Sequence, residues 1–77
     1  MAKLSATSGE FEYQWASDVD FDGIRLEVLT ADRDVMFDVS VPEVGDMTVN
    51  TFGLEIPAEL IATAVNAARK RRTDSGT

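Results

Sequence analysis

In the stretch LEIPAELIATAVNAARKRR, residues Leu54 to Arg72, the apolar residues change from the spacing of a strand to the spacing of a helix. Pro57 suits the first helical position, where a missing N–H is not needed, which makes Ile56 the N-terminal cap. Glu59 near the start and the basic residues near the end complement the helix dipole. The expected apolar stripe consists of Leu60, Ile61, Ala64, Val65 and Ala68. We therefore predict one helix of about four turns.

Four segments that precede this helix alternate apolar and polar residues, which predicts half-buried strands. They run from Glu10 to Trp15, from Ile24 to Thr30, from Val35 to Val41 and from Met47 to Phe52. The segments between them are short and contain Asp, Gly and Pro, which are typical of turns. Short turns favour antiparallel neighbours. We therefore predict an α+β fold, a four-stranded antiparallel sheet in the order β-β-β-β-α with one C-terminal helix packed on one face.

The two ends of the chain lack this pattern. Residues 1–9, MAKLSATSG, are small and mostly polar, and we expect them to form a flexible N-terminal arm. Residues 10–72 are expected to form a single α+β domain, and residues 73–77, TDSGT, a disordered C-terminal tail. A domain of this size buries only about 60% of the surface that its unfolded chain exposes, so its stability should be modest.

Phe11, Tyr13 and Trp15 share one face of the first predicted strand. A helix is about 10 Å wide and strands lie about 4.8 Å apart, so one helix covers two or three strands well. The terminal strand is therefore expected to be covered least. Two alternatives follow. Either the sheet coils strongly and the aromatic side chains join the core, or part of the stripe stays exposed and contacts a partner or a second copy.

The composition argues against several classes of function. Cysteine and histidine are both absent, so the usual nucleophile–base pairs, thiolate zinc sites and disulfides cannot form. We expect no enzymatic activity and no cofactor. No segment has the roughly 18 consecutive apolar residues of a membrane span, and the start lacks the features of a signal peptide. We therefore expect a cytoplasmic protein without a membrane partner.

The chain has 14 acidic and 7 basic residues, a formal net charge of -7, which disfavours nucleic acid as a partner and favours a protein with a basic surface. All but one of the acidic residues lie between Glu10 and Glu59, whereas the run Arg69 to Arg72 is basic throughout. This run could contact phosphates, but phosphates would repel so acidic a body. We interpret the run as complementing the helix dipole.

The stretch SDVDFDGIRL, after the first predicted strand, resembles the start of a calcium-binding EF-hand loop. Asp18, Asp20 and Asp22 have the spacing that the motif requires, and Gly23 follows them as it should. The closing position of the motif, however, needs a bidentate glutamate and holds Leu29, and no helix pattern precedes the loop. We therefore interpret the stretch as an acidic turn and expect no metal site.

These observations favour a small non-enzymatic protein-binding module that docks on a basic surface of a partner protein. An inhibitor or blocking protein fits this description, such as an immunity-type protein or a phage anti-defence or host-takeover factor that mimics the charge of nucleic acid. Charges speed encounter, and aromatic side chains anchor a complex. The predicted partner-binding residues are Glu10, Glu12, Tyr13, Trp15, Asp18, Asp20 and Asp22. The alternative is a structural or assembly subunit that forms homodimers or larger oligomers through its N-terminal aromatic strand.

Overall fold

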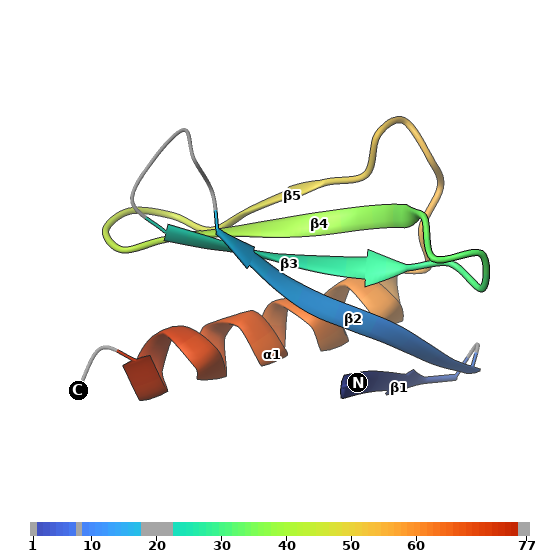
Figure 1. Cartoon of the computed structure of the whole chain (residues 1–77), viewed down its shortest axis with the longest axis horizontal. Helices are drawn as coiled ribbons and strands as arrows, with labels where there is room; N and C mark the ends of the chain where they lie inside the picture. The colour runs from blue at the N-terminus through green and yellow to red at the C-terminus, as the bar shows by residue number, and fades with distance from the viewer. Residues whose placement is uncertain (1, 8, 18–22, 76–77) are drawn as a thin grey trace.

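The computed structural model describes residues 2–7, 9–17 and 23–75, which contain five strands and one helix. The elements are β1 (Ala2–Ala6), β2 (Gly9–Ser17), β3 (Gly23–Leu29), β4 (Val35–Pro42), β5 (Thr48–Asn50) and α1 (Ala58–Ser75). The strands lie side by side in chain order, and each pairs antiparallel with its neighbour (Figure 1). The predicted α+β class, an antiparallel sheet with a C-terminal helix, is confirmed.

The sheet has one strand more than the four predicted, because β1 forms from part of the expected N-terminal arm. The backbone of β1 pairs with the first half of β2, and Leu4 lies opposite Phe11. Leu4 is buried in the core while Lys3 and Ser5 are exposed, which is the alternation of a half-buried strand. The residues around Leu4 are small or polar, so the sequence pattern of this strand is weak.

Both ends of the helix differ from the prediction. The helix begins after Pro57, whose carbonyl accepts hydrogen bonds from the N–H groups of Leu60 and Ile61. Pro57 is therefore the N-terminal cap in place of Ile56. At the other end, Thr73 to Ser75 continue α1, and residues 76–77 of the expected disordered tail lie outside the described residues.

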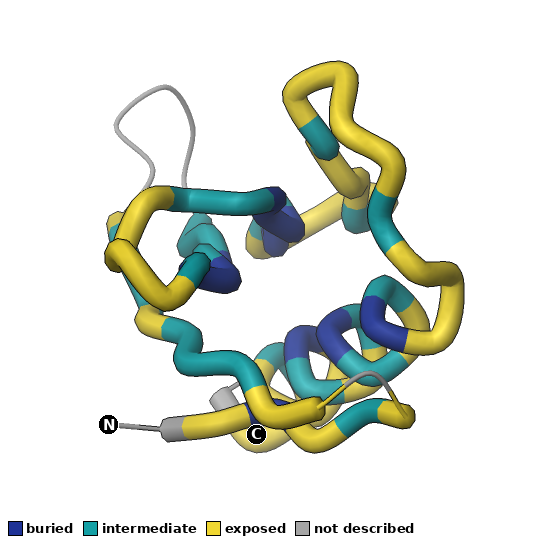
Figure 2. Tube along the Cα trace, turned by 90° about the vertical axis from the view of Figure 1, so that its right-hand side faces the viewer, coloured by how far each residue is buried: buried dark blue, intermediate teal, exposed yellow. Residues whose placement is uncertain are grey.

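The core lies between one face of the sheet and α1, which packs on β1, β3 and β4. In Figure 2 the buried segments of the strands and of the helix face one another across the interior. The buried core residues are Leu4, Leu26, Val28, Phe37, Val39, Val41, Leu60, Ala64 and Ala68. Phe11, Tyr13 and Trp15 pack against this core and are half-buried, so β2 also belongs to the covered part of the sheet.

Thr7, in the connection between β1 and β2, binds the first turn of α1 through Glu59. The Thr7 backbone N–H donates to Glu59 Oε1 at 2.7 Å. Its hydroxyl lies 2.6 Å from both carboxylate oxygens and donates to this carboxylate. These hydrogen bonds favour the charged form and therefore lower the pKa of Glu59 below its usual value. The contact joins the N-terminal hairpin to the helix.

We expect Glu59→Gln to destabilise the chain near neutral pH and to matter less in acid. The pKa of Glu59 is lower in the folded than in the unfolded chain, so its contribution is fully present above 4.5 and is lost as the pH falls through the folded value. Urea midpoints of parent and variant at about pH 7 and about pH 3 measure the change. Glu55→Gln, a control that removes the same charge from the preceding loop, should show a smaller pH effect. An equal loss from Glu59→Gln at both pH values would contradict the prediction.

Candidate functional site

The sheet has two faces, and α1 packs on only one of them (Figure 1). We call the face that packs on α1 the inner face and the opposite one the outer face. Side chains alternate along β2, so Phe11, Tyr13 and Trp15 belong to the inner face, and Glu12 and Gln14 belong to the outer face. In the part of the chain that the structure describes, no helix covers the outer face.

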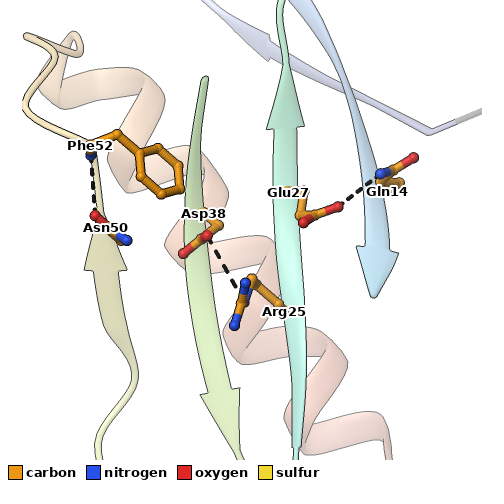
Figure 3. A network of polar contacts seen from close by, with 6 residues as sticks. All are labelled: Gln14, Arg25, Glu27, Asp38, Asn50 and Phe52. Atoms are coloured by element: carbon orange, nitrogen blue, oxygen red, sulfur yellow. Dashed lines mark hydrogen bonds and ion pairs between the residues drawn. The ribbon is translucent and has the colours of Figure 1, made fainter. Parts of the chain in front are cut away.

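Four polar residues form a row across the outer face. Gln14 of β2 lies opposite Glu27 of β3. Glu27 in turn lies opposite Asp38 of β4, and Asp38 lies opposite Asn50 of β5. We call these four residues the polar row (Figure 3). The carboxylates of Glu27 and Asp38 are thus cross-strand neighbours, and like charges in this position destabilise a sheet.

A hydrogen bond and an ion pair involve the two carboxylates of the polar row (Figure 3). Gln14 Nε2 donates to Glu27 Oε1 at 2.8 Å. Arg25 Nε lies 3.9 Å from Asp38 Oδ2, and the Arg25 side chain is 34% exposed. Asp38 is only 3% exposed, so its charge depends on neighbouring groups for stabilisation. Glu27 is half-buried and is therefore the carboxylate of the pair that a partner reaches more easily.

Phe52 is an exposed aromatic residue just after β5, next to the end of the polar row. Its backbone N–H donates to Asn50 Oδ1 at 3.1 Å, and its φ of 54° lies in the left-handed region. This conformation costs about 1–2 kcal/mol for a residue with a side chain, and such strain is concentrated at functional sites. Phe52 is 53% exposed, and in Figure 3 its ring points from the end of β5 toward β4. It gives this end of the row an apolar surface.

The structure separates the residues that the sequence predicted as one site. Glu10 and Glu12 belong to the outer face of β2, and Arg33 Nη1 lies 3.2 Å from Glu12 Oε2. Tyr13 and Trp15 belong to the inner face of the same strand, because successive residues of a strand point to opposite sides. The remaining predicted residues, Asp18, Asp20 and Asp22, lie outside the described residues.

Trp15 makes its contacts with other parts of the same chain. Its ring lies edge to face with that of Tyr13, with centroids 6.0 Å apart and planes at 85°. The Arg71 guanidinium lies 5.4 Å from the centroid of the Trp15 ring, a cation–π contact that ties the end of α1 to β2. Arg72 Nη1 donates to Gly45 O at 2.8 Å, which ties the same helix end to the β4–β5 loop. Two members of the basic run therefore hold the helix in place.

Comparisons with protein-family models, with curated proteins and with solved structures gave no significant match. Among the described residues, no three His, Cys, Asp or Glu side chains form a group that could hold a metal ion. The described chain also contains no helix with the length and hydropathy that crossing a membrane requires.

Three residues of this face, Glu27, Asp38 and Phe52, were not among the predicted site residues. The alternation along β3 and β4 already predicts that Glu27 and Asp38 lie away from the core. Their position directly opposite each other depends on the register between the two strands. Phe52 ends a predicted strand, and the sequence signal for its turn is the glycine that follows it, Gly53, whose φ is 79°. A glycine after an aromatic residue is a weak signal by itself.

Proposed function

We propose that this chain is a small non-enzymatic inhibitor or blocking protein that docks its outer face on a basic surface of a partner protein. The observation that supports this most is the position of Glu27, opposite Asp38 in the middle of the outer face. Arg25 already pairs with Asp38, so a Lys or Arg side chain of the partner would act mainly on the half-buried carboxylate of Glu27. The net charge of -7 adds long-range attraction to a basic partner.

The charges and the aromatic residue have different roles in this proposal. Glu10, Glu12 and Glu27 attract and orient the partner, because exposed charges act mainly on the association rate. Phe52 is the anchor, since an aromatic side chain that becomes buried in a complex slows dissociation. Tyr13, like Trp15, packs against the core on the other face, so Phe52 replaces them as the proposed anchor.

An immunity-type protein or a phage anti-defence or host-takeover factor fits this arrangement. In such a protein the carboxylates of one surface occupy the place of nucleic-acid phosphates on the partner. The support here is that Glu10, Glu12 and Glu27 all belong to one face of one sheet and are not fully buried. A nucleic-acid-binding protein is the class of partner that this charge distribution suits best.

The alternative, an assembly subunit that oligomerises through its N-terminal aromatic strand, has less support. That strand, β2, pairs with β1 from Gly9 to Tyr13 and with β3 from Tyr13 to Ser17. Its side chains Tyr13 and Trp15 pack against the core of the same chain, so less of their surface is left for a second copy. Among the described strands, the outermost positions belong to β1 and β5.

Glu27→Gln should weaken the binding of a basic peptide about fivefold, because an exposed ion pair contributes up to about 1 kcal/mol. The probe is a short peptide of alternating arginine and threonine, titrated into the isotope-labelled full chain and followed by NMR. We expect shifts centred on the polar row and Phe52. Affinity should also fall when salt rises from about 0.01 M to about 0.1 M, because the Debye length shortens from about 30 Å to about 10 Å.

Glu55→Gln is the matched control, because it removes the same charge from the loop before α1 and should leave affinity within about twofold. Phe52→Ala should weaken binding without changing its salt dependence, since it removes apolar contact and no charge. Equal losses from Glu27→Gln and Glu55→Gln, or shifts confined to α1, would rule out the outer face as the docking site.

A further inference from the structure

The strand β5 forms one margin of the sheet. It pairs with β4, and among the described residues no strand pairs with its other edge. Natural edge strands are commonly protected from further pairing by short length, charged residues or proline. The strand β5 has only 3 residues, but residues 47–54, MTVNTFGL, contain neither a charged residue nor a proline. Val49, in the middle of β5, is exposed. The backbone of β5 is therefore open to the addition of a strand from another chain.

A groove with a volume of about 490 Å³ lies between β5 and the C-terminal half of α1. It forms because α1 packs on β1, β3 and β4, so that the sheet extends beyond the helix at β5. Met47 and Val49 line the groove from the sheet, and Val65 lines it from the helix. This volume lies within the range of about 300–1,000 Å³ that is typical of binding sites.

The charged residues of the groove have the opposite balance from the protein as a whole. Arg69, Arg72 and Asp46 line the groove, so two cations accompany one anion on a chain whose net charge is -7. Arg72 is held in position by its hydrogen bond to Gly45 O at 2.8 Å. A guanidinium has five N–H donors, so this bond leaves donors for a carboxylate. The groove thus combines three apolar side chains with two basic groups from α1.

We propose that this groove binds an extended acidic segment of a partner protein. The segment adds a strand to the outer edge of β5 and places apolar side chains against Met47, Val49 and Val65. Its carboxylates pair with Arg69 and Arg72, whose planar guanidinium groups match a carboxylate in two hydrogen bonds. Main-chain hydrogen bonds give affinity in this mode of binding, and alternate side chains give specificity.

A second copy of the chain suits the groove less well. The segment of that copy which would pair with β5, residues 47–54, offers no acidic side chain to Arg69 and Arg72, and two copies with a charge of -7 repel each other. The groove is also separate from the outer face, because Val49 lies opposite the core residue Val39. The inference therefore goes beyond the proposed blocking function and does not depend on it.

The test uses a capped peptide of about seven residues in which Glu, Val, Val and Glu alternate with Thr, so that one face of the strand matches the groove. Its counterpart carries Lys in place of both Glu residues. In NMR titrations of the full chain, the Glu peptide should give saturable shifts at Met47, Val49, Val65 and Arg69, and the Lys peptide should give none. Arg69→Ala should weaken binding about fivefold, whereas Lys70→Ala, a matched control beside the groove, should leave it within about twofold.

Four results would each overturn the proposal. They are equal binding of the two peptides, equal effects of Arg69→Ala and Lys70→Ala, shifts centred on the outer face, and no binding of either peptide. Sedimentation of the chain alone should show a monomer at every concentration. The mass could instead increase with concentration, and Val49→Lys could abolish this increase. That result would identify a second copy as the occupant of the groove and would also overturn the proposal. Failure here leaves the blocking function standing, because the arginine peptide and Glu27→Gln test the opposite face.

Discussion

Phe37→Ala should remove a large fraction of the folding free energy, whereas the same substitution at Phe52 should leave it nearly unchanged. Phe37 is 0% exposed in the core, and Phe52 is 53% exposed. Truncating a buried phenylalanine to alanine costs about 3–5 kcal/mol, through the lost burial and the cavity that remains. The free energy of unfolding of a domain is roughly 0.05–0.15 kcal/mol per residue, so a chain this short has little reserve.

Urea unfolding followed by circular dichroism measures both variants. Phe52→Ala should stay within about 0.5 kcal/mol of the parent, which makes it suitable for the binding experiment. Phe52→Gly should be more stable than Phe52→Ala, because glycine adopts the left-handed conformation without a steric penalty. If Phe52→Ala instead costs as much as Phe37→Ala, the Phe52 side chain is part of the core and cannot be the docking anchor.

Asp38→Ala is expected to have the second large effect, about 2–3 kcal/mol of lost stability, because removing one member of a buried ion pair leaves a charge without compensation. Asp38 is buried on the outer face, and its Oδ2 lies 3.9 Å from Arg25 Nε. The loss should fall short of the 3–5 kcal/mol that is usual for fully buried pairs, since the Arg25 side chain is 34% exposed and keeps part of its hydration.

The double substitution of Arg25→Met with Asp38→Leu should recover most of this loss, because apolar side chains of similar size replace buried ion pairs at little cost. Glu27→Ala is the control on the same face. It gives up the hydrogen bond from Gln14 but relieves the repulsion of Asp38, so its net effect should stay within about 0.5 kcal/mol. Urea midpoints of the four proteins decide the matter. An Asp38→Ala variant as stable as Glu27→Ala would mean that the ion pair contributes nothing.

The fold follows from the sequence wherever a strand carries several large apolar residues on one face. The strand β4 is such a case, with Phe37, Val39 and Val41 all in the core. The strand β1 is the opposite case, because Leu4 is its single large apolar residue and is recognised as a strand residue only through its pairing with Phe11. Local periodicity does not contain that pairing.

The site is predictable from the sequence only in part. Alternation along a strand places Glu12 and Tyr13 on opposite faces of β2. The predicted partner-binding site contained both residues, which a single face of that strand does not allow. The meeting of Glu27 and Asp38 needs the register of β3 and β4, which shifts by a bulge just beyond these residues. The exposure of Phe52 depends on a turn held by the Asn50 side chain, for which the sequence has no firm signal.

Trp15 is the only tryptophan of the chain, and Arg71 of α1 lies against its ring. The intrinsic fluorescence of the protein therefore reports on one place, the contact of the last turns of α1 with β2. Circular dichroism, in contrast, averages over the whole backbone. On heating, the fluorescence transition could occur at a lower temperature than the dichroism transition. Such a result would show that the end of the helix separates from β2 while the sheet stays folded, so that unfolding is not two-state.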